Sequence, residues 1–440
     1  MIMGTGKTRV AIEVARKIEA RSILIHCPLR VVAVWPEQFE RFAPAKYQCM
    51  ALDDRVKSVG DKTLMAKDLA RWGHEHSQRV AIAVNYESAW REPFASWALS
   101  RPWDLVIADE AHRAKSPVSR TSRYLAQLGL RAHRRLALTG TPMAHQPTDI
   151  WAQFRFLDPH FLDPTFSQFR DRYAVLGGYF NKEIVGWKNL DQLEAQFRTL
   201  AFRVDDSVLD LPPELDQTLT CNLGEKGEKI YRQMEAEMIA WIETEEGLGR
   251  EVTAANAMVK LLRLQQITGG TVRDPEGHDI HVDLAKEDLL SDLLEDLREP
   301  VVVFARFKSD LAAIHRAAGK AGHASGELSG SRDDSDDWRQ GRRKLTVLAT
   351  QIQAGGIGVD LTRARIAVYY SLGFSLTEYL QSRARVRRPP QQRPCLFYHL
   401  QARGSVDEYI LRAVEARGDL INSVLGELKK KGKEHVPALR

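Results

Sequence analysis

Cysteine is scarce in this sequence. Only four of the 440 residues are cysteines, Cys27, Cys49, Cys221 and Cys395. No two of them stand close together, so the paired spacing of a structural zinc site is missing. Sparse cysteine is typical of proteins in a reducing compartment. The sequence therefore predicts such a compartment and no zinc site of the Cys-x-x-Cys kind.

Long hydrophobic runs and a strong charge bias are also missing. No stretch approaches the roughly 18–20 apolar residues of a membrane-spanning helix, and charges interrupt residues 1–17 too early for a signal peptide. We therefore expect a cytoplasmic location and no membrane partner. Because 63 Lys and Arg stand against 58 Asp and Glu, the net charge is only +5. That balance alone does not predict a nucleic-acid partner.

Two parts of the chain alternate short apolar runs with amphipathic, helix-like segments. In the first part the runs are 22–26 (SILIH), 80–84 (VAIAV), 105–108 (LVIA) and 136–138 (LAL), with helical patterns at 8–20 and 119–129. In the second part they are 301–305 (VVVFA), 345–349 (LTVLA), 366–370 (IAVYY) and 395–399 (CLFYH), with a helical pattern at 309–321. Apolar runs that alternate with helices predict parallel sheets covered on both faces. The predicted fold class is therefore α/β.

The predicted domain organisation has four parts. Residues 1–158 form a first lobe and residues 286–425 a second lobe. Between them, residues 159–285 form a helical insertion and linker, in which a Leu-Pro-Pro break at 211–213 precedes a mostly helical pattern at 231–263. Residues 426–440 form a basic tail that contains KKKGK.

A phosphate-binding loop is the first chemical signal. Gly4-Thr5-Gly6-Lys7-Thr8 opens a helical pattern and matches the end of a Walker A motif. Its glycines let backbone N–H groups approach phosphate oxygens, while the lysine neutralises the β- and γ-phosphates and the Thr8 hydroxyl binds Mg²⁺. Taken alone, the run could also be a chance glycine-rich turn.

The beginning of this loop is incomplete. Met1 stands where the first glycine of the motif is expected, and the strand that carries such a loop falls before residue 1. An in-frame upstream continuation that encodes an apolar strand and a Gln-containing segment would show that Met1 is a mis-called start.

A pair of acids follows a predicted buried strand. Asp109 and Glu110, in DEAH, come directly after 103–108 (WDLVIA), and ligands of open α/β sheets bind at the carboxyl ends of strands. Asp109 is placed to hold Mg²⁺ through water, and Glu110 to polarise the attacking water as a general base. Alternatively, an acid at this position simply belongs to a polar loop at the end of the strand. That interpretation is reasonable for one acid, but it does not explain why DEAH follows GKT in the same chain.

Together these motifs resemble superfamily-two helicases, and the flanking residues narrow the resemblance to Swi/Snf-related translocases. The flanking matches are 26–29 (HCPL) with Trp35 and Glu37, 85–87 (NYE), 109–115 (DEAHRAK), 138–142 (LTGTP), and Trp151 with 156–159 (FLDP). Weaker matches follow at 261–269, Lys286, 301–304 and 406–410. The resemblance implies two RecA-like parallel-sheet lobes that bind ATP and Mg²⁺. It also implies that His112, Thr139, Thr141 and Gln381 couple hydrolysis to movement.

The second lobe carries two further matches to this family. Residues 355–362 (GGIGVDLT) resemble its glycine motif, in which Gly358 and Asp360 approach the nucleotide or a DNA phosphate; Asp360 stands where Asn is more usual. Residues 381–391 (QSRARVRRPPQ) resemble its Q…R..R.GQ motif, so Arg385 and Arg388 align with the two arginines. Residues three apart on a helix share one face. When the two lobes close, both arginines would reach the γ-phosphate that the first lobe binds. Alternatively, an arginine in this run lies on a surface that faces solvent or DNA, and we accept that interpretation for Arg383 and in part for Arg387.

Double-stranded DNA is the partner that the resemblance implies, together with further subunits of a DNA-processing complex. Backbone amides, hydroxyls and a few basic side chains suffice to hold DNA phosphates. The residues placed for such contacts are Arg30, Arg113, Lys115, Arg306, Thr350 and Gln353.

Three functions remain open from the sequence. The first is an ATP-dependent translocase or helicase on duplex DNA. The second is the motor subunit of a restriction, repair or recombination complex. The third is an inactive nucleic-acid-binding remnant of such a motor.

Overall fold

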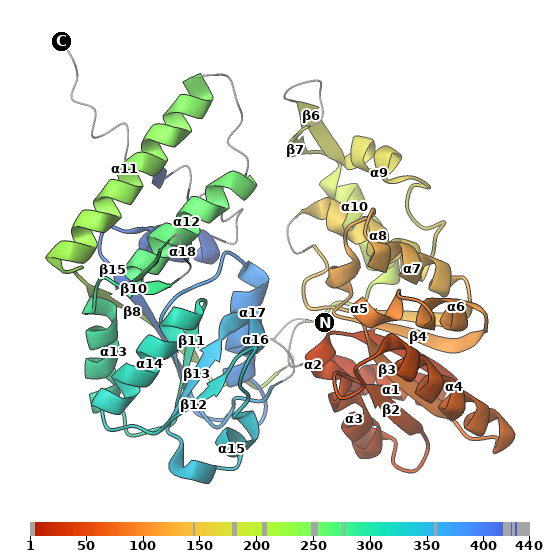
Figure 1. Ribbon diagram of the computed structural model, residues 1–440. Helices are drawn as coiled ribbons and strands as arrows, with labels where there is room; N and C mark the ends of the chain where they lie inside the picture. The colour runs from red at the N-terminus through yellow and green to blue at the C-terminus, as the bar shows by residue number, and fades with distance from the viewer. Residues whose placement is uncertain are drawn as a thin grey trace. The chain divides into compact units, whose positions relative to one another are not determined.

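The computed structural model describes residues 5–143, 146–177, 183–204, 209–247, 254–274, 276, 278–355, 359–416, 424 and 427–428. The chain forms two compact units, Met1–Leu209 and Asp210–Arg440. Both appear in Figure 1, with the first unit in red to yellow-green and the second in green to blue.

The first unit is built on a sheet of five parallel strands in the order β2-β3-β1-β4-β5. The strands are β1 (Ser22–Cys27), β2 (Gln48–Leu52), β3 (Val80–Asn85), β4 (Trp103–Asp109) and β5 (Ala132–Leu138). Helix α1 (Lys7–Lys17) precedes β1. The helices between the strands are α2 (Leu29–Val32), α3 (Val34–Phe42), α4 (Val59–Glu75), α5 (Tyr86–Ala89), α6 (Phe94–Leu99) and α7 (Arg120–Gly129).

Helices cover both faces of this sheet, because successive strand residues point to opposite sides. Leu24 and Ile82 pack with α4, α6 and α7. Ile23, Ile25 and Ala81 pack with α1 and α3. Both sets of strand residues are fully buried, which is why these strands read as continuous apolar runs.

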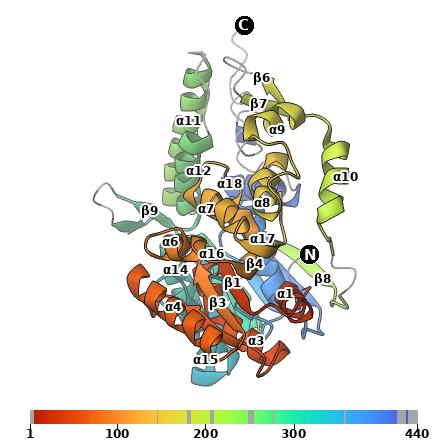
Figure 2. The same ribbon diagram turned by 90° about the vertical axis from the view of Figure 1, so that its right-hand side faces the viewer.

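A smaller core lies after the last strand of this sheet. Helices α8 (Ile150–Leu157), α9 (Phe166–Tyr173) and α10 (Leu190–Leu200) bury an aromatic-rich cluster that includes Trp151 and Phe154. The antiparallel strands β6 (Ala174–Gly177) and β7 (Glu183–Trp187) lie beside α9 (Figure 2). This region therefore belongs to the first unit.

The second unit contains a six-stranded parallel sheet in the order β12-β13-β11-β14-β15-β8. Its strands are β8 (Glu214–Cys221), β11 (Val301–Ala305), β12 (Ser325–Leu328), β13 (Val347–Gln351), β14 (Ile366–Tyr369) and β15 (Cys395–Ala402). A short antiparallel pair, β9 (Thr271–Arg273) and β10 (Asp279–His281), lies outside it.

Helices again cover both faces. They are α11 (Glu225–Gly247), α12 (Ala254–Thr268), α13 (Ala285–Asp296), α14 (Lys308–Lys320), α15 (Ser335–Arg339), α16 (Ile352–Gly355), α17 (Leu376–Val386) and α18 (Val406–Glu415). Val302 and Phe304 pack with α12, α17 and α18. Val301 and Val303 pack with α13 and α14.

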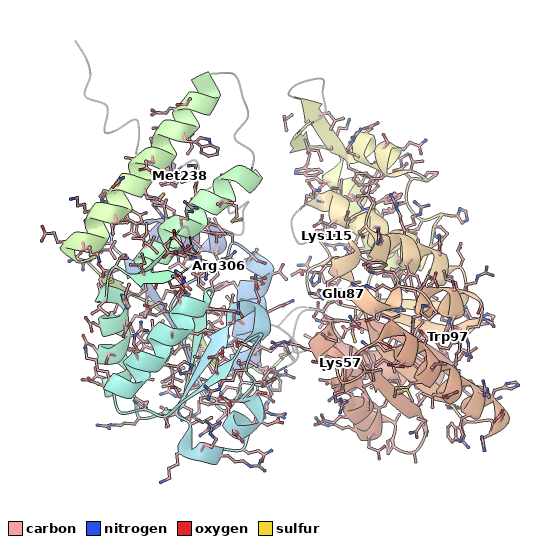
Figure 3. All side chains as sticks on the ribbon, in the orientation of Figure 1. Lys57, Glu87, Trp97, Lys115, Met238 and Arg306 are labelled. Atoms are coloured by element: carbon pink, nitrogen blue, oxygen red, sulfur yellow. The ribbon has the colours of Figure 1, made fainter. Side chains whose placement is uncertain are left out.

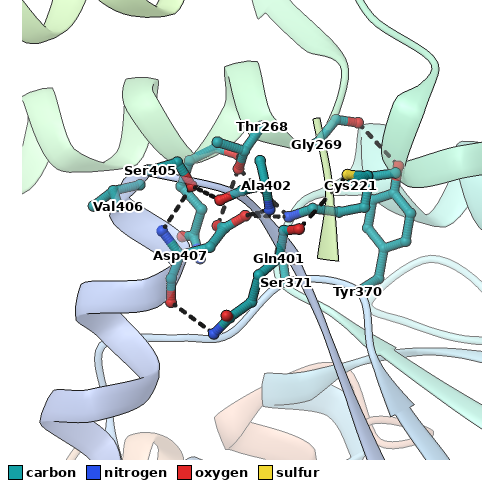
Figure 4. Close-up of polar contacts among 12 residues, drawn as sticks. Cys221, Thr268, Gly269, Tyr370, Ser371, Gln401, Ala402, Ser405, Val406 and Asp407 are labelled. Atoms are coloured by element: carbon teal, nitrogen blue, oxygen red, sulfur yellow. Dashed lines mark hydrogen bonds and ion pairs between the residues drawn. The ribbon is translucent and has the colours of Figure 1, made fainter. Parts of the chain in front are cut away.

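A buried ion pair and its hydrogen bonds join four elements of the second unit (Figure 4). The Lys286 Nζ of α13 lies 2.5 Å from Asp407 Oδ2 of α18, and the two side chains are only 1% and 5% exposed. Asp407 also accepts hydrogen bonds from the Thr268 hydroxyl at 3.0 Å and from the Ala402 amide at 3.2 Å. The carboxylate is thus satisfied by charge and by hydrogen bonds, as a buried charge must be.

The predicted α/β class with parallel sheets is confirmed. The boundary after Leu209 divides the predicted insertion, because α9 and α10 pack with the first unit while β8, α11 and α12 pack with the second. That segment contains strands as well as helices. The predicted basic tail lies outside the described residues, apart from 427–428. Among the residues that the structure describes, no helix is both long and apolar enough to cross a bilayer.

Candidate active site

The phosphate loop leads into α1. Gly4 lies outside the described residues, whereas Gly6 precedes the helix with φ +81°, a backbone conformation that favours glycine. The Gly6 carbonyl accepts a hydrogen bond from the Val10 amide at 3.0 Å, so Gly6 is the N-cap of the helix. Lys7 and Thr8 are the first two residues of α1, and the N-terminus of a helix favours an anion.

The acidic pair lies at the carboxyl end of β4, as predicted. Asp109 is the last residue of the strand, and its carbonyl accepts a hydrogen bond from the buried Tyr86 hydroxyl at 2.8 Å. The Glu110 amide donates to Asp109 Oδ1 at 3.0 Å. Glu110 itself has φ 52° and ψ 51°, a left-handed conformation that is costly for a residue with a side chain and is often kept at functional sites.

His112 connects Glu110 to the next motif. Its Nδ1 lies 3.4 Å from Glu110 Oε2 and 3.2 Å from the Thr139 hydroxyl. Burial lowers the pKa of His112; Glu110 opposes this shift, and nearby cations, Lys7 among them, add to it. The imidazole is therefore neutral near pH 7, so it can donate at one nitrogen and accept at the other.

Two oxygen atoms around His112 are buried without a hydrogen-bond partner among the described residues. They are Glu110 Oε2 and the Thr141 Oγ1. Thr141 is held in place through its amide, which donates to Thr139 Oγ1 at 3.1 Å. A buried polar atom without a partner is costly, so these oxygens fit a site that a ligand or an ordered water completes.

Mg²⁺ fits this arrangement with few protein ligands. In the described part of the chain no three His, Cys, Asp or Glu side chains gather as a metal cluster. Mg²⁺ commonly takes one or two protein oxygens and completes its shell with phosphates and water. Thr8 at the start of α1 and Asp109 at the end of β4 are the residues that would hold it.

A polar chain behind the acidic pair was not predicted from the sequence. Glu87 lies 3.4 Å from Arg113, and each belongs to a matched motif of the first unit, 85–87 and 109–115 (Figure 3 labels Glu87). Glu87 also accepts from Asn85 Nδ2 at 3.0 Å, and the buried Lys62 donates to Asn85 Oδ1 at 3.1 Å. Lys62 lies on α4, far from any motif in sequence, so only the fold could reveal it.

The glycine motif of the second unit is only partly described. Gly358 lies outside the described residues. Asp360 Oδ1 accepts hydrogen bonds from the Thr362 amide at 2.9 Å and the Thr362 hydroxyl at 2.7 Å. Asp360 therefore caps the turn that follows, and its role towards a nucleotide stays a prediction.

The arginine motif requires one correction. Helix α17 ends at Val386, so Arg388 lies beyond it, and the prediction that Arg385 and Arg388 share one helical face is wrong. Arg388 Nε is buried without a hydrogen-bond partner among the described residues. Gln381 is buried within the helix, only 8% exposed.

Arg383 and Arg387 are not solvated surface residues, contrary to the alternative that we accepted for them. Arg383 is only 9% exposed and pairs with Asp216 and Glu214. Arg387 Nε donates to the Pro212 carbonyl at 2.7 Å. Both side chains therefore bind the segment around the start of β8.

The predicted DNA-contact residues differ in exposure. Thr350 is fully buried, and its hydroxyl donates to the Leu348 carbonyl at 3.4 Å, so it is not available to DNA. Gln353 is exposed, and Arg30 is half-buried. Lys115 Nζ lies 3.8 Å from Asp149 Oδ2, and Arg306 packs its guanidinium against Phe307 and Phe374 at 5.8 and 5.7 Å (Figure 3).

The chain belongs to the SNF2-related family. The family model described as "SNF2-related domain" matches residues 3–270, more than half of the chain. This match includes the phosphate loop, the DEAH segment and the Thr139–Thr141 motif, and thus the part of the chain whose geometry is described above.

Curated relatives agree with this family. The chain is 23% identical over 454 residues to DNA repair and recombination protein RDH54 of Saccharomyces cerevisiae, covering 94% of this chain and 47% of that protein. It is 26% identical over 442 residues to the mouse Chromodomain-helicase-DNA-binding protein 1-like, covering 96% and 47%. The chain thus spans about half the length of these relatives.

A phage protein is similar over almost its whole length. Putative protein p41 of Acyrthosiphon pisum secondary endosymbiont phage 1 is 24% identical over 460 residues, with 98% of this chain and 94% of that protein covered. Among solved structures, the Sulfolobus solfataricus SWI2/SNF2 ATPase core in complex with dsDNA matches at 22% identity and a TM-score of 0.39, covering 98% of this chain and 91% of that chain.

Proposed function

We propose that this chain is an ATP-driven translocase that couples ATP hydrolysis to movement along duplex DNA. The observation that carries the proposal is the position of His112, within 3.4 Å of both Glu110 and Thr139. One neutral side chain therefore lies beside both the acid that would activate water and the segment that would respond to nucleotide state. An anion site without a mechanical role would have no need for that link.

Within the first unit, each residue has a separate task in hydrolysis. Lys7, at the start of α1, would neutralise the phosphates of bound ATP. Thr8 and Asp109 would hold Mg²⁺, which would supply further charge neutralisation at the phosphates. Glu110 accepts the proton of the attacking water through the carboxylate oxygen that otherwise has no hydrogen-bond partner.

Arg385 and Arg388 are proposed to stabilise the charge of the transition state. A guanidinium supplies several donors in a fixed plane and stays charged, so it suits phosphoryl oxygens. The buried, unpartnered Nε of Arg388 supports the assignment, because a donor in that state gains a partner when phosphate binds.

Duplex DNA is the proposed track. The names of two relatives, DNA repair and recombination protein and helicase-DNA-binding protein, support DNA as the substrate. Exposed or half-buried polar side chains at Arg30, Lys115, Arg306 and Gln353 are proposed for phosphate contacts. Contacts of that kind position a protein on DNA without reading its sequence.

The test is ATP turnover with and without duplex DNA. We expect duplex DNA to stimulate turnover, and Lys7→Ala to abolish it. Lys17→Ala is the matched control, since it removes an exposed lysine from the last turn of the same helix. Turnover that persists in Lys7→Ala would contradict the assignment of the phosphate loop. A strand-displacement assay on a forked duplex separates unwinding from translocation.

A second candidate is a motor subunit of a DNA repair or recombination complex. It is favoured by the similarity to a protein named for repair and recombination, of which this chain covers 47%. In that case duplex DNA alone would stimulate turnover weakly, and a partner protein would be needed for full activity. Absence of turnover under all conditions would instead favour a nucleic-acid-binding remnant.

A further inference from the structure

The arginines on and just after α17 fall into two groups. Arg383 and Arg387 contact the segment from Pro212 to Asp216, through which the chain enters the second unit. Arg385 and Arg388, in the same stretch, are the proposed catalytic arginines. The arginines that bind the start of β8 and the proposed catalytic arginines are therefore close together in the chain, so the first pair could position the second.

Arg383 is held in one orientation by a fork of hydrogen bonds. Its two terminal nitrogens donate to the two carboxylate oxygens of Asp216 at 2.5 and 2.9 Å. A third acceptor, Glu214 Oε2, lies 3.0 Å away. A bidentate arginine–carboxylate pair fixes direction as well as distance, so it can define where a helix lies on a strand.

Two aromatic side chains, one on β15 and one on α17 itself, also contact this guanidinium. Its Cζ lies 3.8 Å from the centre of the Phe397 ring of β15, and one nitrogen donates to the Tyr379 hydroxyl at 2.8 Å. Tyr379 in turn meets His399 Nε2 at 3.0 Å. Burial lowers the pKa of His399 to about 4, so this histidine is neutral and adds no repulsion to the arginine.

The preceding residue of the helix is anchored as well. The Ser382 hydroxyl lies 2.7 Å from the Tyr369 hydroxyl of β14, and Tyr369 stacks on His399 with ring centres 5.0 Å apart. Two consecutive residues of α17, Ser382 and Arg383, are therefore bound to the sheet, and one residue separates them from Arg385. The position of α17 along its axis is set at this point.

We propose that Arg383 is a positioning residue that locks α17 to strand β8 and thereby sets Arg385 and Arg388 for ATP hydrolysis. The proposal rests on the proposed function for its effect on turnover. Since β8 is the first strand after the boundary between the units, the lock joins the proposed catalytic arginines to the segment by which the chain enters the second unit. A misplacement of about 1 Å at such groups can lower turnover by roughly a hundredfold.

Asp216→Ala is the most informative variant. The Asp216 side chain is 44% exposed, so its removal opens the fork without opening the core. Arg383→Lys keeps the charge but cannot form the bidentate pair. Asp288→Ala is the matched control, because it removes the acid of an exposed ion pair with Lys320 on other helices of the same unit.

We expect Asp216→Ala to lower DNA-stimulated kcat by roughly ten- to a hundredfold. The KM for ATP should change less than about twofold. The thermal midpoint should stay close to that of the control, Asp288→Ala. Arg383→Lys should show the same split. The double variant should be no slower than the slower single variant, since both changes break one interaction. Unchanged kcat in Asp216→Ala, or a loss that is confined to KM, would overturn the proposal.

A second readout does not depend on activity. Amide hydrogen exchange of peptides from α17 should rise in Asp216→Ala and Arg383→Lys and stay at the wild-type level in Asp288→Ala. Unchanged exchange in α17 would overturn the lock even if kcat falls. If wild-type protein shows no DNA-stimulated turnover, the proposed function fails while the exchange data still decide whether Arg383 fixes the helix.

Discussion

Replacing Lys286 with methionine should destabilise the second unit strongly. Methionine has a similar length but leaves the Asp407 carboxylate, which is 5% exposed, without the ammonium group 2.5 Å away. Breaking one side of a buried ion pair costs about 3–5 kcal/mol, because the remaining charge has lost both water and partner. The hydrogen bonds from Thr268 and Ala402 to Asp407 place the expected loss towards the lower end of that range.

Denaturant-dependent hydrogen exchange of the full chain can measure this loss. It reports each unit separately, which a single unfolding curve of a two-unit chain does not. Lys320→Met is the control, because its partner Asp288 and Lys320 itself are exposed, and exposed pairs contribute little. Adding Asp407→Asn to Lys286→Met should restore much of the stability by removing the stranded charge. A loss no larger than the control's, or no recovery in the double variant, would refute the reasoning.

Three further predictions concern the first unit and the arginine motif. Glu110→Gln should retain ATP binding but stop turnover, measured by nucleotide binding and phosphate release; retained hydrolysis would contradict its role as general base. Arg388→Ala should lower DNA-stimulated kcat more than ATP affinity, and a pure affinity loss would argue against a catalytic role. Burial lowers the pKa of His26 to about 3, below its ordinary value of about 6.5, so the unfolded chain binds the proton more readily and stability is lost as pH falls below about 6.5. Between pH 7 and pH 5 this should cost about 2 kcal/mol, and His26→Phe should remove that pH dependence in exchange measurements on the first unit.

Strands with two neighbours could be predicted from the sequence. Among the edge strands of the two described parallel sheets, β2, β8 and β12 could not, and β5 was matched only by the short run at 136–138. The run at 80–84 became β3, whose six residues are all buried between β2 and β1. Strand β8 (ELDQTLTC) has only one neighbour, and its first five residues are exposed. It therefore carries polar side chains in place of an apolar run, and nothing local marks it as a strand.

The residues of the candidate site also differ in whether the sequence alone could reveal them. The positions of Lys7, Asp109 and Glu110 could be predicted because each lies in a short motif at the end of a strand or the beginning of a helix. The contact of Arg383 could not, because its partner Asp216 is 167 residues away in the chain. Only the pairing of β8 with β15 places the acid beneath α17.

The placement of β8 also sets an order for folding during synthesis. Glu214 pairs with Cys395, so the earliest strand of this sheet must wait for the latest one before it gains a neighbour. Loop closure over such a distance is slow. During synthesis the whole first unit would emerge from the ribosome well before the second unit could complete its sheet. Until then β8 exposes an unpaired backbone edge, which is where we expect chaperone binding or aggregation of the nascent chain to begin.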